Sequence, residues 1–226
     1  MSGRAPDLII FDSDGVLVDS EPIANRILAA HLSAAGYPCT FAQSVERFVG
    51  RSLSSIIAMV EEDRGHPLPD GFYDAVQVAT FAALREELKP VPGVADALRR
   101  IAAPKCVASS GRIEKLDLTL GVTGLRAHFG DRLFSATMVR RGKPYPDLFL
   151  LAAARMGVAP ADCVVVEDSL PGVEAARAAA MRVLGYAGGS HVADGHAVRL
   201  TGAGATVFTD MADLPDLILS NHPVPA

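Results

Sequence analysis

The chain has 226 residues, half of them hydrophobic, and its 21 basic and 26 acidic side chains give a formal net charge of −5. This length allows one large domain or one domain with a smaller module, and the apolar fraction suffices for a buried core rather than a disordered chain. A net acidic chain is a poor candidate for wrapping nucleic acid, because neutralising phosphates requires a basic face. We therefore expect a globular protein without a nucleic-acid partner.

The N-terminal segment and the cysteines argue against export. The apolar run before Asp12 spans only Leu8 to Phe11, which is too short for a signal peptide. The longest stretch without charged residues, 27–45, is interrupted by polar residues, Gly and Pro, so we expect no membrane span. The three cysteines are far apart and fit neither a disulfide framework nor a metal knuckle. These features favour a cytoplasmic protein that does not bind membranes.

The chain opens with a continuous apolar run at Leu8–Phe11, which is typical of a strand buried on both faces. A block of helical patterns without any strand follows, with one helix between Ser20 and Gly36 and others at 42–48, 53–64 and 71–88. From Lys89 onwards helices and strands alternate. Strands are expected at 105–109, 133–135, 163–167, 182–186 and 206–208, and helices at 94–103, 113–120, 147–156, 172–180, 194–200 and 214–219.

Strands that alternate with helices predict an α/β fold with a doubly wound parallel, Rossmann-like sheet. The first strand belongs to this pattern but is separated from it by the helical block. The simplest explanation is one α/β core with an inserted all-helical domain. We therefore expect residues 1–19 to form the first strand and a flap of the core, 20–88 the helical insert, and 89–226 the rest of the core.

Polar residues follow several of these strands, and ligands of open parallel sheets bind beyond the carboxyl ends of the strands. The residues expected at that edge are Asp12, Asp14, Ser109, Ser110, Lys143, Glu167 and Asp168. Taken singly, they can be turn acids, strand-ending serines, a helix cap and a solvated lysine. Together, four acids at one edge would repel one another unless a cation lay among them. Oxygen ligands without His or Cys suit Mg²⁺, and a lysine with a serine hydroxyl suits a phosphoryl group, so we predict phosphoryl chemistry.

Four stretches carry a family resemblance: FDSDGVLVDSE at 11–21, VASSG at 107–111, GKPYPD at 142–147 and VEDSLPG at 166–172. In this order they resemble the haloacid dehalogenase-like superfamily, in its branch of β-phosphoglucomutases and small sugar-phosphate phosphatases. The resemblance covers essentially the whole chain. Within this branch, residues 101–158 are most similar to bacterial phosphatases that act on 6-phosphogluconate.

The resemblance implies a role for each residue of the edge. Asp12 would be the nucleophile that forms an aspartyl phosphate, and Asp14 the general acid and base. A carboxylate oxygen of Asp12, the main-chain carbonyl of Asp14 and Asp168 would hold Mg²⁺, with Glu167 close by or acting through water. The phosphoryl oxygens would be held by Ser109, Ser110 and Lys143.

The helical insert would be a cap that closes over this site. The resemblance places Gly50, Arg51 and Ser52 in its substrate-facing loop, where Arg51 could read a carboxylate or hydroxyl group. A solvated surface arginine is an equally open explanation of Arg51.

Several alternatives remain beside hydrolysis. A phosphomutase of the β-phosphoglucomutase type carries a cap histidine where this chain has Ala24. A dehalogenase needs neither Asp14 nor the acids at 167 and 168, and a non-enzymatic phospho-acceptor is much shorter and orders its motifs differently. We therefore expect a Mg²⁺-dependent phosphatase that hydrolyses a small sugar- or sugar-acid-phosphate monoester. Its partner would be that small phosphorylated metabolite, and we expect a monomer.

Overall fold

The computed structural model describes residues 6–49, 51–190, 192 and 194–220. The chain divides into two compact units: Met1–Asp19 together with Lys89–Ala226, and Ser20–Leu88. Within the described ranges, no helix combines the length and the apolar character that a membrane crossing requires.

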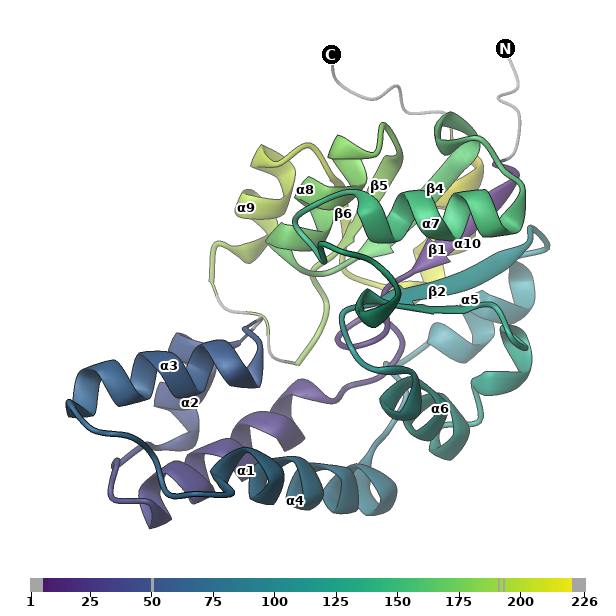
Figure 1. Ribbon diagram of the computed structural model, residues 1–226. Helices are drawn as coiled ribbons and strands as arrows, with labels where there is room; N and C mark the ends of the chain where they lie inside the picture. Colours follow the sequence, from purple (N-terminus) through teal and green to yellow (C-terminus); the bar gives the residue numbers. More distant parts are fainter. Residues whose placement is uncertain (1–5, 50, 191, 193, 221–226) are drawn as a thin grey trace. The chain divides into compact units, whose positions relative to one another are not determined.

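The larger unit is built on one six-stranded sheet in which every neighbouring pair of strands is parallel (Figure 1). The strand order is β3-β2-β1-β4-β5-β6. The strands are β1 (Leu8–Phe11), β2 (Lys105–Ser109), β3 (Leu133–Ser135), β4 (Cys163–Glu167), β5 (Arg182–Tyr186) and β6 (Thr206–Phe208). Every residue of β1 and β4 is buried, as expected for central strands that are covered on both faces. The predicted doubly wound parallel sheet is confirmed.

Helices cover this sheet on both faces (Figure 1). They are α5 (Val94–Arg100), α6 (Ile113–Val122), α7 (Asp147–Met156), α8 (Leu170–Ala178), α9 (His196–Gly202) and α10 (Leu214–Leu219). Helix α7 contacts β1, β2 and β3, α8 contacts β4 and β5, and α9 contacts β5 and β6, whereas α5 packs against α10. The interior is apolar, and it includes Phe11 with its ring edge-on to Phe129 at 5.9 Å between centroids. This packing fixes the strand ends that carry the polar residues.

Several helix boundaries differ from the predicted ones by one to three residues, and three of the differences have a local cause. The helix expected at 94–103 ends at Arg100, because Ile101 is extended and Pro104 disfavours helical backbone just before it. The helix expected from Gly172 begins at Leu170, because the Ser169 side chain caps it. The helix expected at 194–200 lies at His196–Gly202, because Gly195 before it has a φ of +76°, which favours glycine.

The smaller unit is all-helical, as the fold prediction requires. It contains α1 (Glu21–Ala34), α2 (Phe41–Phe48), α3 (Leu53–Arg64) and α4 (Phe72–Glu87). Helix α1 packs against α2 and α4 around an apolar cluster that includes Leu32 and Phe48. One buried polar pair joins α1 to α2, in which Ser44 Oγ donates to Asn25 Oδ1 at 2.8 Å. The unit therefore has a core of its own.

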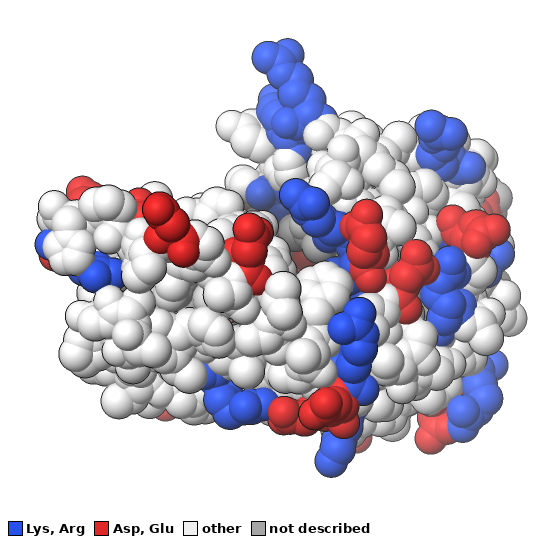
Figure 2. Space-filling view, turned by 60° about the horizontal axis from the view of Figure 1, so that its bottom comes forward, with Lys and Arg blue, Asp and Glu red and all other residues white. Residues whose placement is uncertain are grey.

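The net negative charge does not take the form of a single acidic surface on the face shown in Figure 2, where acidic and basic side chains are interspersed. By contrast, three of the acids that the sequence motifs single out, Asp12, Glu167 and Asp168, are buried. Burying carboxylates costs free energy unless they are paired, so their surroundings decide what this part of the molecule can do.

Candidate active site

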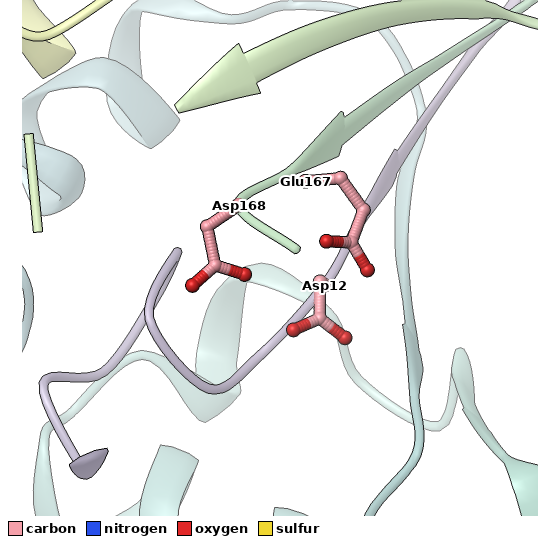
Figure 3. Close-up of side chains that lie close together, drawn as sticks. All are labelled: Asp12, Glu167 and Asp168. Atoms are coloured by element: carbon pink, nitrogen blue, oxygen red, sulfur yellow. The ribbon is translucent and has the colours of Figure 1, made fainter. Parts of the chain in front are cut away.

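Three buried carboxylates meet where β1 and β4 end. Asp12 directly follows β1, Glu167 is the last residue of β4, and Asp168 comes next. The two strands pair in parallel with Phe11 beside Val166, and the Asp12 main-chain N–H donates to the Val166 carbonyl at 2.9 Å. This register brings one oxygen of each carboxylate within 4.8 Å of the others (Figure 3). The structure thus brings these three predicted residues together.

Lys143 reaches into this cluster from the loop before α7. Its Nζ donates to Asp12 Oδ1 and to Glu167 Oε1, each at 2.6 Å, and lies 5.1 Å from the centre of the Phe149 ring. Burial by itself would lower the pKa of Lys143, but the two carboxylates raise that pKa above its ordinary value. The ammonium therefore stays charged and compensates part of the negative charge of the cluster.

The surroundings of Asp12 make its carboxylate harder to ionise. Burial is the main cause that raises the pKa of Asp12 well above its ordinary value; the neighbouring Glu167 and Asp168 raise it further, and Lys143 opposes them. A divalent cation among these oxygens would act in the same direction as Lys143. Buried carboxylates without His or Cys donors are the ligand set that suits Mg²⁺, so the residues fit the predicted metal.

The start of α8 holds the Glu167 carboxylate in place. Glu167 Oε2 accepts hydrogen bonds from the main-chain N–H and the hydroxyl of Ser169, at 2.6 and 2.9 Å. Ser169 Oγ in turn accepts from the Gly172 N–H at 3.1 Å. A Cβ atom at position 172 would lie 1.9 Å from Glu167 Oε1. Gly172 is therefore needed for the close approach of this carboxylate to the helix.

Asp14 lies near the cluster in sequence, but its side chain contacts a different lysine. The three-carboxylate group of the described residues does not include Asp14, whose Oδ2 accepts from Lys115 Nζ at 2.8 Å. The turn that carries Asp14 needs Gly15, which has a φ of +81° and donates its N–H to the Val18 carbonyl. Sequence reasoning missed Lys115. The available signal was a lysine in the first turn of the helix that begins after β2.

The two predicted phosphate-binding serines differ in position. Ser109 ends β2, is buried, and its Oγ accepts from the Gly111 N–H at 3.1 Å. Ser110 is exposed. The phosphate-binding role of both serines remains a prediction. Because Ser109 is buried and Ser110 is exposed, Ser109 is the better placed of the two for a fixed hydrogen bond.

No sequence pattern pointed to His196. Its Nε2 donates to the main-chain carbonyl of Asp168 at 2.6 Å, and its Nδ1 lies 3.3 Å from an Arg199 nitrogen. Because a carbonyl can only accept, Nε2 carries the proton and Nδ1 accepts from the guanidinium. The histidine thus ties α9 to the segment that carries Asp168.

The predicted substrate loop belongs to the helical unit. Gly50 lies outside the described residues. Arg51 is exposed, and its Nε donates to the Arg47 carbonyl at 3.3 Å. Ser52 is the N-cap of α3 and accepts from the Ser55 N–H at 3.1 Å. Ser52 therefore has a local structural role, and the contact of this loop with a substrate remains a prediction.

Comparisons with known proteins agree with this geometry. A family model described as haloacid dehalogenase-like hydrolase matches residues 6–180. The chain is 32% identical to the 6-phosphogluconate phosphatase of Escherichia coli K12, across 93% of this chain and 94% of that protein.

Two solved structures have the same fold. One is a conserved haloacid dehalogenase-like protein of unknown function from Agrobacterium tumefaciens, 43% identical, with a TM-score of 0.85 over 94% of this chain and 97% of that one. The other is a haloacid dehalogenase family hydrolase from Deinococcus radiodurans with bound phosphate and sodium. It is 31% identical, with a TM-score of 0.78 over 93% of this chain and 94% of that one. The chain belongs to the haloacid dehalogenase-like hydrolase family and is an enzyme of its phosphomonoesterase class, as the four motifs predict.

Proposed function

We propose that this enzyme is a Mg²⁺-dependent phosphatase that hydrolyses small sugar- or sugar-acid-phosphate monoesters through an aspartyl phosphate on Asp12. The observation that carries the proposal is the buried group of Asp12, Glu167 and Asp168 joined by Lys143 at the carboxyl ends of parallel strands. The 6-phosphogluconate activity of the E. coli relative and the phosphate bound to the Deinococcus protein support a small phosphate ester as the substrate.

The metal would be held by a carboxylate oxygen of Asp12, the main-chain carbonyl of Asp14 and the carboxylate of Asp168, with Glu167 close by or acting through water. When bound, Mg²⁺ supplies positive charge to the phosphoryl oxygens and offsets the charge of the acids. Burial is the main cause that raises the pKa of Asp12, whereas a nucleophilic carboxylate has to be ionised. A bound cation would favour the ionised form, which supports this assignment of the metal ligands.

In the first displacement a carboxylate oxygen of Asp12 attacks phosphorus, and the bond from phosphorus to the ester oxygen breaks. Asp14 donates its proton to that oxygen, so the sugar leaves as an alcohol. Lys143 keeps its hydrogen bond to Asp12 Oδ1 and thereby fixes the orientation of the nucleophile. The product of this step is an aspartyl phosphate on Asp12.

In the second displacement a water molecule attacks the same phosphorus, and the bond to the Asp12 oxygen breaks. Asp14 accepts the proton of the water that it activates, which returns it to the acid form. The Ser109 hydroxyl and the Lys143 ammonium would hold the phosphoryl oxygens during both steps. The sum is one ester and one water converted to one alcohol and one phosphate.

The all-helical unit would act as a cap that keeps bulk water from the aspartyl phosphate. In that role Arg51 would bind a hydroxyl or carboxylate of the leaving group, for which a guanidinium supplies paired donors. A panel of sugar, sugar-acid and polyol phosphates assayed with the wild type and with Arg51→Ala tests this role. A cap contact predicts a higher KM for the preferred substrate and little change for an aryl phosphate.

The central test is phosphate release from p-nitrophenyl phosphate with Mg²⁺ and with a chelator. We expect release by the wild type only with the metal, no release by Asp12→Asn, and wild-type release by Asp131→Asn, which removes an exposed acid. Borohydride should trap the acyl phosphate on Asp12. Metal-independent release by Asp12→Asn would refute the proposal. Conversion of β-glucose 1-phosphate, given a trace of bisphosphate, to the 6-phosphate faster than phosphate release would replace hydrolysis by mutase activity.

A further inference from the structure

The proposed mechanism assigns no role to Lys115, although this lysine contacts one of its two aspartates. Lys115 lies in the first turn of α6, and its Nζ donates to Asp14 Oδ2 at 2.8 Å. Both side chains are partly buried. Asp14 therefore has a cation of its own, just as Asp12 has Lys143.

The surroundings of Gly111 show that this ion pair lies beside the predicted phosphate-binding serine. A Cβ atom at position 111 would lie 3.4 Å from Lys115 Cδ, 3.5 Å from Ser109 Oγ and 3.9 Å from Asp14 Oδ2. The three side chains thus surround one point, each at an ordinary van der Waals distance from it. The Gly111 backbone is itself held, because its carbonyl accepts from Ser135 Oγ at 2.7 Å.

The use of lysine is selective in this chain. Its only lysines are Lys89, Lys105, Lys115 and Lys143, and all its other basic side chains apart from the histidines are arginines. Two of the four lysines contact the two aspartates of the first motif. A lysine ammonium is a compact positive charge that can donate to a nearby carboxylate oxygen.

We propose that Lys115 is a positioning residue for the general acid and base: its ammonium holds the Asp14 carboxyl beside Ser109, where the leaving oxygen of the ester would lie. The inference rests on the proposed function, and it adds to that function the group that orients its acid. A general acid has to lie within hydrogen-bond reach of the oxygen that it protonates. In the first displacement the proton passes from Asp14 to the ester oxygen, and Lys115 keeps its own protons.

This role predicts a dependence on the leaving group. A sugar alkoxide is a poor leaving group and needs the proton of Asp14, whereas p-nitrophenolate leaves without it. Lys115→Met should therefore lower kcat/KM for a sugar phosphate by about 10- to 100-fold, which is below the full effect of general acid catalysis, and for p-nitrophenyl phosphate by about threefold or less. The parameter kcat/KM is chosen because it reports on the first displacement.

Matched variants separate positioning from a structural effect. Lys115→Arg keeps a cationic donor and should restore most of the activity toward the sugar phosphate. Glu114→Gln, which changes one charge at the neighbouring exposed position of α6, should behave as wild type. In the Asp14→Asn background, Lys115→Met should cause no further loss, because the group through which Lys115 acts is gone. Equal losses on both substrates, or a further loss in that background, would overturn the inference.

A second readout does not depend on activity. The side-chain carboxyl ¹³C resonance of Asp14, assigned by its disappearance in Asp14→Asn, should be single and narrow in the wild type and in Lys115→Arg. In Lys115→Met it should broaden or shift, because the carboxyl samples more than one orientation. An unchanged resonance would overturn the inference. If the wild type releases no phosphate from any ester, the proposed function fails, and this spectrum still decides whether Lys115 positions Asp14.

Discussion

Two lysine–aspartate pairs lie at the carboxyl edge of the sheet, and they differ in their access to water. In the pair of Lys143 and Asp12 the side chains are 5% and 10% exposed, whereas in the pair of Lys115 and Asp14 they are 26% and 20% exposed. Their N–O distances are similar, at 2.6 and 2.8 Å. Charges attract more strongly where water is excluded, and a buried charge that loses its partner is costly. The pair of Lys143 and Asp12 should therefore contribute more to the stability of the fold, whereas the more exposed pair of Lys115 and Asp14 should contribute little to stability while still orienting Asp14.

The largest effect is expected from Lys143→Met. The substitution leaves the buried carboxylates of Asp12 and Glu167 without their shared cation, which should lower the free energy of unfolding by about 3 kcal/mol in the absence of Mg²⁺. Urea denaturation measures this loss. Lys89→Met, which removes an exposed ammonium, is the control. A Lys143→Met protein as stable as the wild type would erase the distinction between the two pairs.

Glycine substitutions test how tightly the Glu167 carboxylate, the second partner of Lys143, is packed. Gly172→Ala places a methyl group into the Glu167 carboxylate, so it should cost about 1–3 kcal/mol of stability and abolish phosphate release. Gly121→Ala is the matched control, because a Cβ at that helical position meets no atom within 4 Å. It should stabilise the protein by about 0.5 kcal/mol. Thermal unfolding and phosphate release measure both effects, and a harmless Gly172→Ala would show that Glu167 is free to move.

A smaller effect on stability is expected from Lys115→Met. Since the pair with Asp14 is partly exposed, its loss should change the free energy of unfolding by about 1 kcal/mol or less, even though activity toward a sugar phosphate falls. Urea denaturation of this variant beside Lys143→Met gives the comparison directly. A loss as large as that of Lys143→Met would mean that both pairs support the fold.

The smallest effect is expected from the two buried thiols Cys106 and Cys163, whose reactivity tests whether water is excluded from the core. Burial raises the pKa of Cys106 to about 12 and that of Cys163 to about 11. Because the thiolate is the reactive form, both should resist a thiol reagent at pH 8 in the folded protein and react at once in denaturant. In the unfolded chain these thiols ionise at their ordinary pKa of about 9, before they ionise in the folded protein. The free energy of unfolding should therefore fall as the pH rises from about 9 towards the raised pKa values. Rapid reaction in the folded state would show that water reaches the core.

Much of the site could be predicted because it follows directly from strand ends. The apolar runs at Leu8–Phe11 and Cys163–Glu167 mark buried strands, and parallel neighbours bring their carboxyl ends together. Asp12 and Asp168 follow these runs immediately. The strand pattern alone therefore places these acids at the same edge of a parallel sheet, and the long-range pairing of β1 with β4 makes them neighbours.

Other features could not be predicted, because they depend on contacts that local sequence does not encode. Lys115 and Asp14 are 101 positions apart, and Lys115 alone has the pattern of a solvated helix lysine. The need for Gly172 appears only when the Glu167 carboxylate is placed against it. The same holds for the contact of His196 with the Asp168 carbonyl, which joins a late helix to the end of β4.

The sequence by itself determined the parallel α/β core, the all-helical insert and the set of acids at one edge of the sheet, since hydrophobic periodicity and strand ends are local properties. Only the tertiary structure decided which lysine pairs with which carboxylate. That choice depends on the direction of side chains from a loop and a helix that are far from the aspartates in the chain, and on how much water the packed neighbours exclude. Two aspartates separated by one residue thus have different lysines and different depths of burial.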